Sequence, residues 1–212
     1  MSFQEKDKKL LYLWILSSIF LLNDFLFALT RTYVGWLAVD YGSRILAILI
    51  MSYLVLRKKS SFSDFGLAKI GIRPFILWSL VLSGAGIFID QVLSGYLAKI
   101  LPQAQLFHYP EITNHFIKVF DLTFGILLVS VSEETIFRGY YVSVLRPHFK
   151  NEVVFVAVSS ILFGLIHWSH GLSSIGSTAL SGILPLISVI RTGSILPALV
   201  AHYVTDFIWF FK

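Results

Sequence analysis

Long apolar runs separated by short polar stretches form the main pattern of this sequence. The runs are about Leu10–Leu29, Trp36–Leu56, Phe75–Leu97, Leu122–Leu145, Val153–Trp168, Ile175–Ile190 and Ile195–Phe211. A helix of roughly 20 apolar residues crosses a bilayer core about 30 Å thick. The runs lack the alternation typical of barrel strands, so helices are the structure that satisfies their backbone groups in hydrocarbon. The pattern predicts an all-α, polytopic transmembrane helix bundle of about seven spans.

The polar stretches between the runs predict the connections. Residues Arg57–Pro74 carry basic side chains and a few aromatic anchors, which is typical of the membrane interface. Leu101–Asp121 is the longest linker, interrupted by Pro102 and Pro110, and we expect a short amphipathic helix on the membrane surface there. The charged segment Met1–Lys9 precedes an apolar run without a small-residue cleavage site, so we expect a retained first helix.

The amino-acid composition also indicates a membrane protein. The chain is 56% hydrophobic and only 14% charged, with a mean hydropathy of +0.78, whereas soluble domains carry about 25% charged residues. We therefore expect a single membrane-embedded domain over residues 1–212, with the lipid bilayer as its surroundings. The net charge is +5, but no basic patch with interleaved aromatics suggests a nucleic-acid partner. Cysteine is absent, which excludes disulfides and a cysteine nucleophile.

The basic residues favour one orientation. With the N-terminus inside, the inner segments hold Lys6, Lys8, Lys9, Arg57, Lys58, Lys59, Lys69, Arg73, Arg146, Lys150 and Arg191, and the outer segments hold Arg31, Lys99, Lys118 and Lys212. Cytoplasmic loops of membrane proteins are enriched in Lys and Arg. The bias predicts a cytoplasmic N-terminus and an outer C-terminus for seven spans.

Ionisable residues inside the spans mark the candidate site. A charged side chain at the bilayer centre costs about 2.5–3.5 kcal/mol on insertion scales, so each needs a partner or a purpose. The fourth run contains Glu133, Glu134 and Arg138. Glu134 and Arg138 are one helical turn apart and can form an ion pair. Glu133 then lacks a local cation, so we expect it to face a cavity, a distant partner or water.

Histidines in two other spans complete a possible catalytic group. His167 ends the fifth run, and His202 lies in the seventh with Asp206 one turn later. In our hypothesis Glu133 is the general base that activates a water molecule, and His167 orients that water. His202, with Asp206, stabilises the oxyanion of an attacked peptide carbonyl. The active site is therefore expected among spans 4, 5 and 7.

Three short motifs carry a resemblance to a known family. They are Glu133-Glu134…Arg138, Phe163…His167 and His202…Asp206. In order and spacing they resemble the CPBP family, the CAAX-processing and bacteriocin-processing (Abi) intramembrane proteases. The similarity covers about residues 122–211, and the stretches Ser60–Leu67 and Thr192–Ser194 also look like the family.

The resemblance implies hydrolysis of a peptide bond within the membrane by a glutamate-activated water, without a covalent intermediate. It implies that Glu133 is the base, while Glu134, Arg138 and Phe163 support the site. Family members process prenylated proteins, mature or degrade peptides, or confer immunity to bacteriocins. We expect a bacterial plasma-membrane protein that acts on a peptide or membrane-protein substrate; no oligomeric state is predicted.

Two features of the sequence do not fit the expected active site directly. Many members have Asn where this chain has Asp206, and an ionised Asp cannot donate a hydrogen bond to an oxyanion. Asp206 then either orients His202 or is protonated. In addition, His167 comes late in its run while Glu133 and His202 are mid-span, so we expect either a fifth helix shifted or extended to His170 or beyond, or tilted helices.

Other functions remain open for the same residues. Glu133, His167, His202 and Asp206 could ligate zinc, although the glutamate mechanism requires no metal cofactor. They could also relay protons or ions in a transporter, but the sequence has no internal repeat. A third reading is a non-catalytic scaffold for membrane proteins. Asp40 and Arg44, one turn apart in the second run, are interpreted as a structural ion pair.

Overall fold

The chain is an all-helical bundle. Our computed structural model describes residues 3–102 and 106–211, and no strand occurs among them. Among these described residues, five helical segments are long and apolar enough to cross a membrane: Lys6–Phe27, Tyr33–Leu56, Ile72–Ile100, His115–His148 and Leu172–Thr192. Two shorter apolar helices, α7 (Glu152–Leu165) and α9 (Leu196–Phe211), complete the set. The predicted class is confirmed, and the protein is an integral membrane protein.

The fourth helical segment is longer than its apolar run. It consists of α5 (His115–Phe120), η3 (Asp121–Gly125), α6 (Ile126–Glu134), η4 (Thr135–Leu145) and η5 (Arg146–His148). The side chain of Asn114 accepts a hydrogen bond from the Ile117 backbone N–H and caps its start. The expectation of a separate surface helix in the linker is therefore wrong, because the helical residues at its end belong to the spanning segment.

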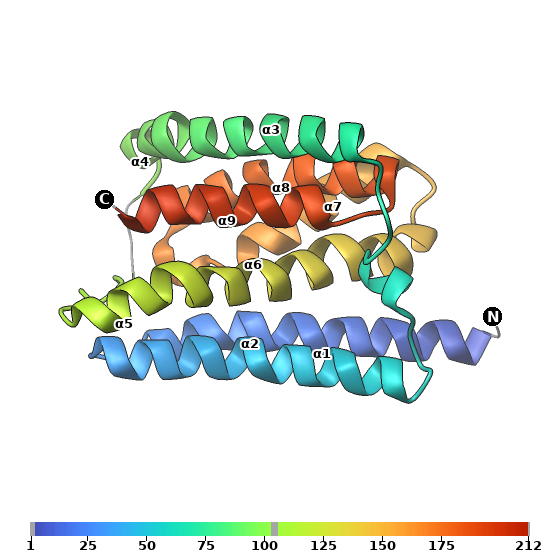
Figure 1. Cartoon of the computed structure of the whole chain (residues 1–212), viewed down its shortest axis with the longest axis horizontal. Helices are drawn as coiled ribbons and strands as arrows, with labels where there is room; N and C mark the ends of the chain where they lie inside the picture. The colour runs from blue at the N-terminus through green and yellow to red at the C-terminus, as the bar shows by residue number, and fades with distance from the viewer. Residues whose placement is uncertain (1–2, 103–105, 212) are drawn as a thin grey trace.

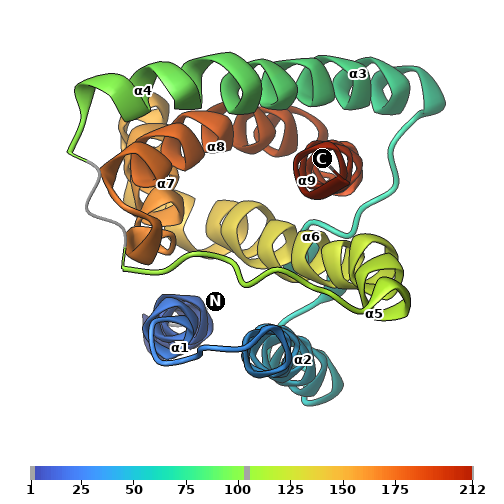
Figure 2. The same cartoon turned by 90° about the vertical axis from the view of Figure 1, so that its left-hand side faces the viewer.

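Successive helices run antiparallel along one axis (Figure 1). The hairpin of α1 (Phe3–Phe27) and α2 (Tyr33–Leu56) packs against one side of the α5–α6–η4 segment. On the other side lie α7, α8 (Leu172–Thr192) and α9, covered by α3 (Ile72–Phe88), η2 (Ile89–Leu93) and α4 (Ser94–Ile100) (Figure 2). The fourth segment thus lies in the middle of the bundle.

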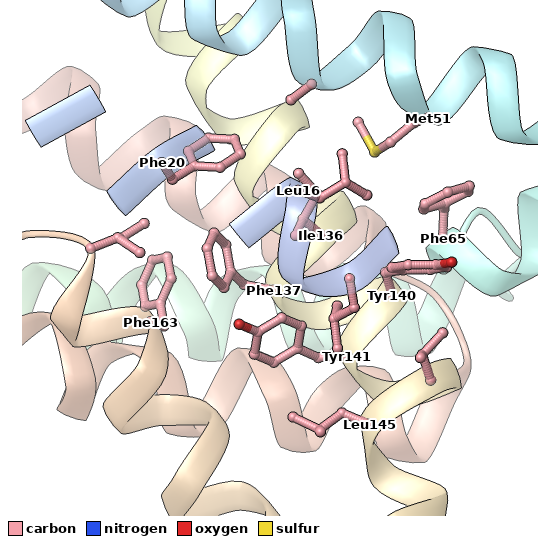
Figure 3. Packing of buried hydrophobic residues seen from close by; sticks show 14 of the residues in the cluster. Leu16, Phe20, Met51, Phe65, Ile136, Phe137, Tyr140, Tyr141, Leu145 and Phe163 are labelled. Carbon is pink, nitrogen blue, oxygen red and sulfur yellow. The ribbon is translucent and has the colours of Figure 1, made fainter. Parts of the chain in front are cut away.

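The centre of the bundle is packed with large side chains from η4 (Figure 3). Phe137 meets Phe20 of α1 edge to face, with 5.6 Å between ring centroids, and lies 5.3 Å from the ring of Phe163 on α7. Tyr140 and Tyr141 are fully buried. Lipid is as apolar as these side chains, so close van der Waals packing, rather than the hydrophobic effect, holds the helices together. The packing fixes the end of α6, from which the site projects.

A short connection ties three parts of the bundle together. The 3₁₀ helix η1 (Phe62–Phe65) ends at Gly66, whose φ of 72° is left-handed and whose carbonyl accepts the Ile195 N–H at 3.0 Å. A side chain at Gly139 of η4 would collide with the carbonyl oxygen of Phe65. This connection also meets α1 through Asp64.

Asp64 forms an ion pair with Lys9 at 2.8 Å. Burial alone would raise the pKa of the Asp64 carboxyl, but hydrogen bonds from Lys9 and the Ser61 backbone, with the Lys9 charge, lower that pKa below its usual value. The first helix is therefore anchored to the connection between α2 and α3.

Candidate active site

The paired glutamates project into a cavity inside the bundle. Glu133 and Glu134 are the last residues of α6, directly before the π-helical η4, and both are almost fully buried. Wide π turns are rare and often occur at functional sites. The cavity has a volume of about 660 Å³, and both carboxylates line it. Buried carboxylates need compensation, and the two obtain it from different partners.

Each carboxylate oxygen of Glu134 has a close partner, although Oε2 accepts no hydrogen bond. Its Oε2 lies 3.2 Å from Nε of Arg138, which confirms the ion pair expected from the spacing. Its Oε1 lies 2.7 Å from Nδ1 of His202 on α9. The Arg138 guanidinium also stacks over the Phe163 ring, 3.7 Å from its centroid, a cation–π contact. These contacts join α6, η4, α7 and α9 at one point.

Glu133 has a partner from another helix. Its Oε1 lies 2.7 Å from Nη1 of Arg44 on α2, and the contact is an ion pair without hydrogen-bond alignment. Its Oε2 lies 3.9 Å from Nε2 of His202. At that separation a single oxygen atom can be within hydrogen-bond distance of both groups. One carboxylate oxygen of Glu133 is thus held, and the other faces the histidine.

His202 is surrounded by carboxylates. Besides Glu134 at Nδ1, its Nε2 lies 3.3 Å from Oδ2 of Asp206, one turn along α9. Both ring nitrogens can donate to these acceptors only when the ring carries both protons. The geometry favours Asp206 as the group that orients His202, because a carboxylate beside a ring N–H acts as its acceptor.

His167 reaches the same cavity from a turn rather than from a helix. The helix α7 ends at Leu165, and a short 3₁₀ helix, η6 (Trp168–His170), follows His167. The expectation of a fifth helix extended to His170 or beyond is therefore wrong, because Gly171, with a φ of 90°, ends the turn before α8 begins. His167 lines the cavity, but its described ring contact is with Phe163, at 5.6 Å between centroids.

The first helix supports this turn. Asp24 of α1 is buried, and its Oδ2 accepts the Ser169 backbone N–H at 2.9 Å. The Trp168 indole N–H donates to the Leu21 carbonyl at 3.2 Å. Because these bonds hold the two residues that directly follow His167, α1 supports the turn that places His167 at the cavity.

The cavity wall along α8 is polar. Hydroxyl groups spaced along one face of this helix line the cavity; they belong to Ser173, Ser174, Ser177, Thr178 and Ser181. The Ser177 and Ser181 hydroxyls donate to carbonyls of their own helix, at 3.2 and 2.9 Å. Their lone pairs can still accept hydrogen bonds from a guest in the cavity.

At one end the cavity is lined by aromatic residues. His170 stacks on Tyr109 with 4.7 Å between ring centroids, and Phe107 and Phe210 contact the same Tyr109 ring. Burial, with the nearby His167 and His108, lowers the pKa of His170 to about 4. The His170 ring is therefore neutral at physiological pH and behaves as an aromatic surface.

A family model decides how this constellation is classified. The model described as "Type II CAAX prenyl endopeptidase Rce1-like" matches residues 115–208. This part of the chain is similar to the Rce1-like family. No curated protein and no solved structure matches the chain. The matched model describes CAAX prenyl endopeptidases, and the matched part of this chain, called the Rce1-like segment below, contains all the site residues expected from the sequence.

Two groups at the site were missed by sequence reasoning because they lie outside the Rce1-like segment. Arg44 was interpreted only as the structural partner of Asp40, and that pair exists, at 3.0 Å. Asp24 had no assigned role. An ionisable residue within a span was the available signal for both, since such residues usually serve a function.

The residues suggested as zinc ligands do not form a metal cluster. Within residues 3–102 and 106–211, no group of three or more His, Asp or Glu side chains is placed to hold a metal ion. Among the suggested ligands, Glu133 pairs with Arg44 instead, and Asp206 lies beside His202.

Proposed function

We propose that the protein is an intramembrane endopeptidase in which Glu133 activates the attacking water. The observation that carries the proposal is the 3.9 Å gap between Oε2 of Glu133 and Nε2 of His202, within a cavity of the Rce1-like segment. A water in this gap would contact the base and the imidazole together. The match to a protease-family model supports peptide hydrolysis as the reaction.

In the proposed reaction Glu133 takes a proton from the water, whose oxygen attacks the scissile carbonyl carbon. The negative charge that forms on the carbonyl oxygen is stabilised by the His202 imidazolium, which Glu134 and Asp206 hold in place. Glu133 then gives the proton to the amide nitrogen as the C–N bond breaks. The products are a carboxylic acid and an amine, and no covalent intermediate or metal cofactor is needed.

His167 is assigned the role of orienting the water. It lies on the cavity wall beside Phe163, and its turn is anchored by Asp24. The helix bundle keeps bulk solvent from this region, which strengthens each electrostatic contact.

The substrate is a peptide or a membrane-protein segment in an extended conformation. The row of hydroxyls on α8 offers hydrogen-bond acceptors for peptide N–H groups that lose water on entering the bundle. The aromatic end of the cavity offers an apolar surface to the other side of the substrate. Processing of a prenylated protein, maturation of a bacteriocin or immunity to one would all use this arrangement.

The test is cleavage of two membrane-tethered reporter peptides, one isoprenylated and one not, by purified protein in detergent. We expect Glu133→Gln to abolish cleavage, because an amide cannot accept the proton from water. Wild-type cleavage should persist in a strong chelator. Lys59→Gln, which removes an exposed charge from a connection outside the cavity, is the control and should cleave normally.

Each other outcome contradicts a specific part of the proposal. Cleavage that is lost with chelator and restored by Zn²⁺ would indicate a metalloprotease. Cleavage that survives Glu133→Gln would remove Glu133 as the base. Absence of cleavage of both reporters by the wild-type protein would favour a non-catalytic scaffold.

A further inference from the structure

Arg44 is a charged residue that enters the site from outside the Rce1-like segment. It lies on α2, which packs against α6, and its side chain is 8% exposed. Its guanidinium reaches Oε1 of Glu133 at 2.7 Å. Arg138 already serves Glu134, so Arg44 is the cation closest to Glu133 among the described ion pairs.

The Arg44 guanidinium is itself held on two further sides. Its Nη2 and Nε lie 3.0 and 3.2 Å from the same carboxylate oxygen of Asp40. Its Cζ lies 4.8 Å above the Phe20 ring of α1. A planar guanidinium fixed in this way presents one edge in a constant direction. The two helices of the α1–α2 hairpin therefore hold the cation in position before any substrate enters.

We propose that Arg44 is a positioning residue for the base: it fixes the Glu133 carboxylate so that Oε2 faces His202 and the water site. This inference rests on the proposed function of Glu133. Arg44 binds Oε1 and leaves Oε2 available, so it acts on the base without occupying its reactive atom. Small errors in the placement of a reacting group cost about 100-fold in rate, which makes such positioning valuable.

Charge balance explains why an arginine stands there. The groups that face Glu133 are Arg44 and Asp40 on α2, Glu134 and Arg138 on its own segment, and His202 and Asp206 on α9. Four carboxylates share three cations, one of them the imidazolium. Without Arg44 the cluster would keep four carboxylates and only two cations in a low-dielectric interior. The Glu133 carboxylate would then lose the partner that fixes its orientation, and a buried charge would be left without its counter-ion.

The kinetic test compares Arg44→Gln with Arg44→Lys in the reporter assay. We expect kcat to fall on the order of 100-fold in Arg44→Gln with KM nearly unchanged, because a residue that acts through the base affects only the transition state. Arg44→Lys should recover part of kcat, since an ammonium keeps the charge but loses the contact with Asp40. Arg57→Gln, which removes an exposed arginine from the C-cap position directly after α2, is the control and should leave both constants unchanged.

A second measurement separates this inference from the proposed function. Thermal unfolding in detergent is recorded for Arg44→Gln, Glu133→Gln and the double variant, none of which needs catalysis. If the ion pair exists, the fall in Tm of the double variant is smaller than the sum of the single falls. Additive falls in Tm, an unchanged kcat in Arg44→Gln, or a lysine variant no better than glutamine would each overturn the inference.

Discussion

The two adjacent carboxylates of the site differ in how their oxygens are used. Both oxygens of Glu134 have close partners, Arg138 and His202, at 3.2 and 2.7 Å. Glu133 has one close partner, Arg44, and one oxygen directed toward the His202 ring at a longer distance. A base needs an oxygen that can accept a proton, and a structural carboxylate does not. The contacts therefore favour Glu133 as the proposed base and Glu134 as its proposed support.

A substitution of Arg138 tests the structural role of Glu134. Replacing Arg138 by Gln leaves Glu134 with His202 as its remaining partner and removes the cation above Phe163. Breaking a buried ion pair on one side typically costs about 3–5 kcal/mol, so we expect a loss of that order in the free energy of unfolding in detergent. Arg31→Gln, at an exposed position, is the control. We expect it to change the free energy of unfolding by less than about 0.5 kcal/mol. Equal stability of the two variants would contradict the structural role.

At the scale of elements, the connection between α2 and α3 fastens the middle of the bundle. Gly66 binds the turn before α9 through the Ile195 N–H, and the backbone of Phe65 lies against Gly139 of η4. The stacked rings of Phe65 and Tyr140, 4.7 Å apart, lie beside this contact. The helix η4 follows the two glutamates directly. The α2–α3 connection therefore also restrains the helical segment that carries the glutamates.

The close approach at Gly139 can be tested with two alanine variants. In Gly139→Ala the new methyl group would collide with a main-chain carbonyl, which cannot move without shifting η1. We expect a loss of about 1–3 kcal/mol in the free energy of unfolding, as for an overpacked core. In Gly42→Ala, within α2, a methyl group would meet nothing within 4 Å, and alanine should be neutral or stabilise the helix by up to about 1 kcal/mol. If Gly139→Ala were as stable as the wild type, this result would contradict the close contact between Gly139 and Phe65.

The sequence predicts those structural features that depend on residues close together in the chain, and it misses those that depend on distant residues. Apolar runs predict the helices, and a four-residue spacing predicts the pair of Glu134 and Arg138, because both depend on near neighbours. The pair of Arg44 and Glu133 joins residues 89 positions apart (133 minus 44) on different helices, so no local pattern predicts it. The turn at His167 was likewise missed, because a left-handed glycine and the contact with Asp24 set it, rather than hydropathy.

The two ends of the helix bundle differ: one is rich in basic residues, and the cavity extends to the other. Basic residues gather in the segments near the N-terminus and in the α2–α3, η5–α7 and α8–α9 connections, at the end where Figure 1 marks the N-terminus. The cavity extends to the opposite end, where Phe107, His108 and Tyr109 line it. The positive-inside rule predicts that the basic end faces the cytoplasm and that the end of the cavity lined by Phe107, His108 and Tyr109 faces outward. Substrates would reach Glu133 from the outer side of the membrane.

Single cysteines can test this orientation, because the chain has none of its own. Exposed positions at both ends are available: Lys59 in the connection after α2, and Arg31 between α1 and α2. His108, an exposed residue that also lines the cavity, reports on the side from which this end of the cavity can be reached. In intact bacterial cells a membrane-impermeant maleimide should label Arg31→Cys and His108→Cys but not Lys59→Cys. Inverted membrane vesicles should give the opposite pattern, since the cytoplasmic face is then exposed to the reagent.

The labelling pattern decides which proteins can be substrates. With His108→Cys labelled from outside, the peptide bond must be presented by exported peptides or by the outer parts of membrane proteins. The reverse pattern would contradict the orientation inferred from the basic residues and place this end of the cavity on the cytoplasmic side. Because His108 and Arg31 lie at the same end of the bundle, they must be labelled from the same side. Labelling of these two from opposite sides would contradict the fold itself rather than its orientation.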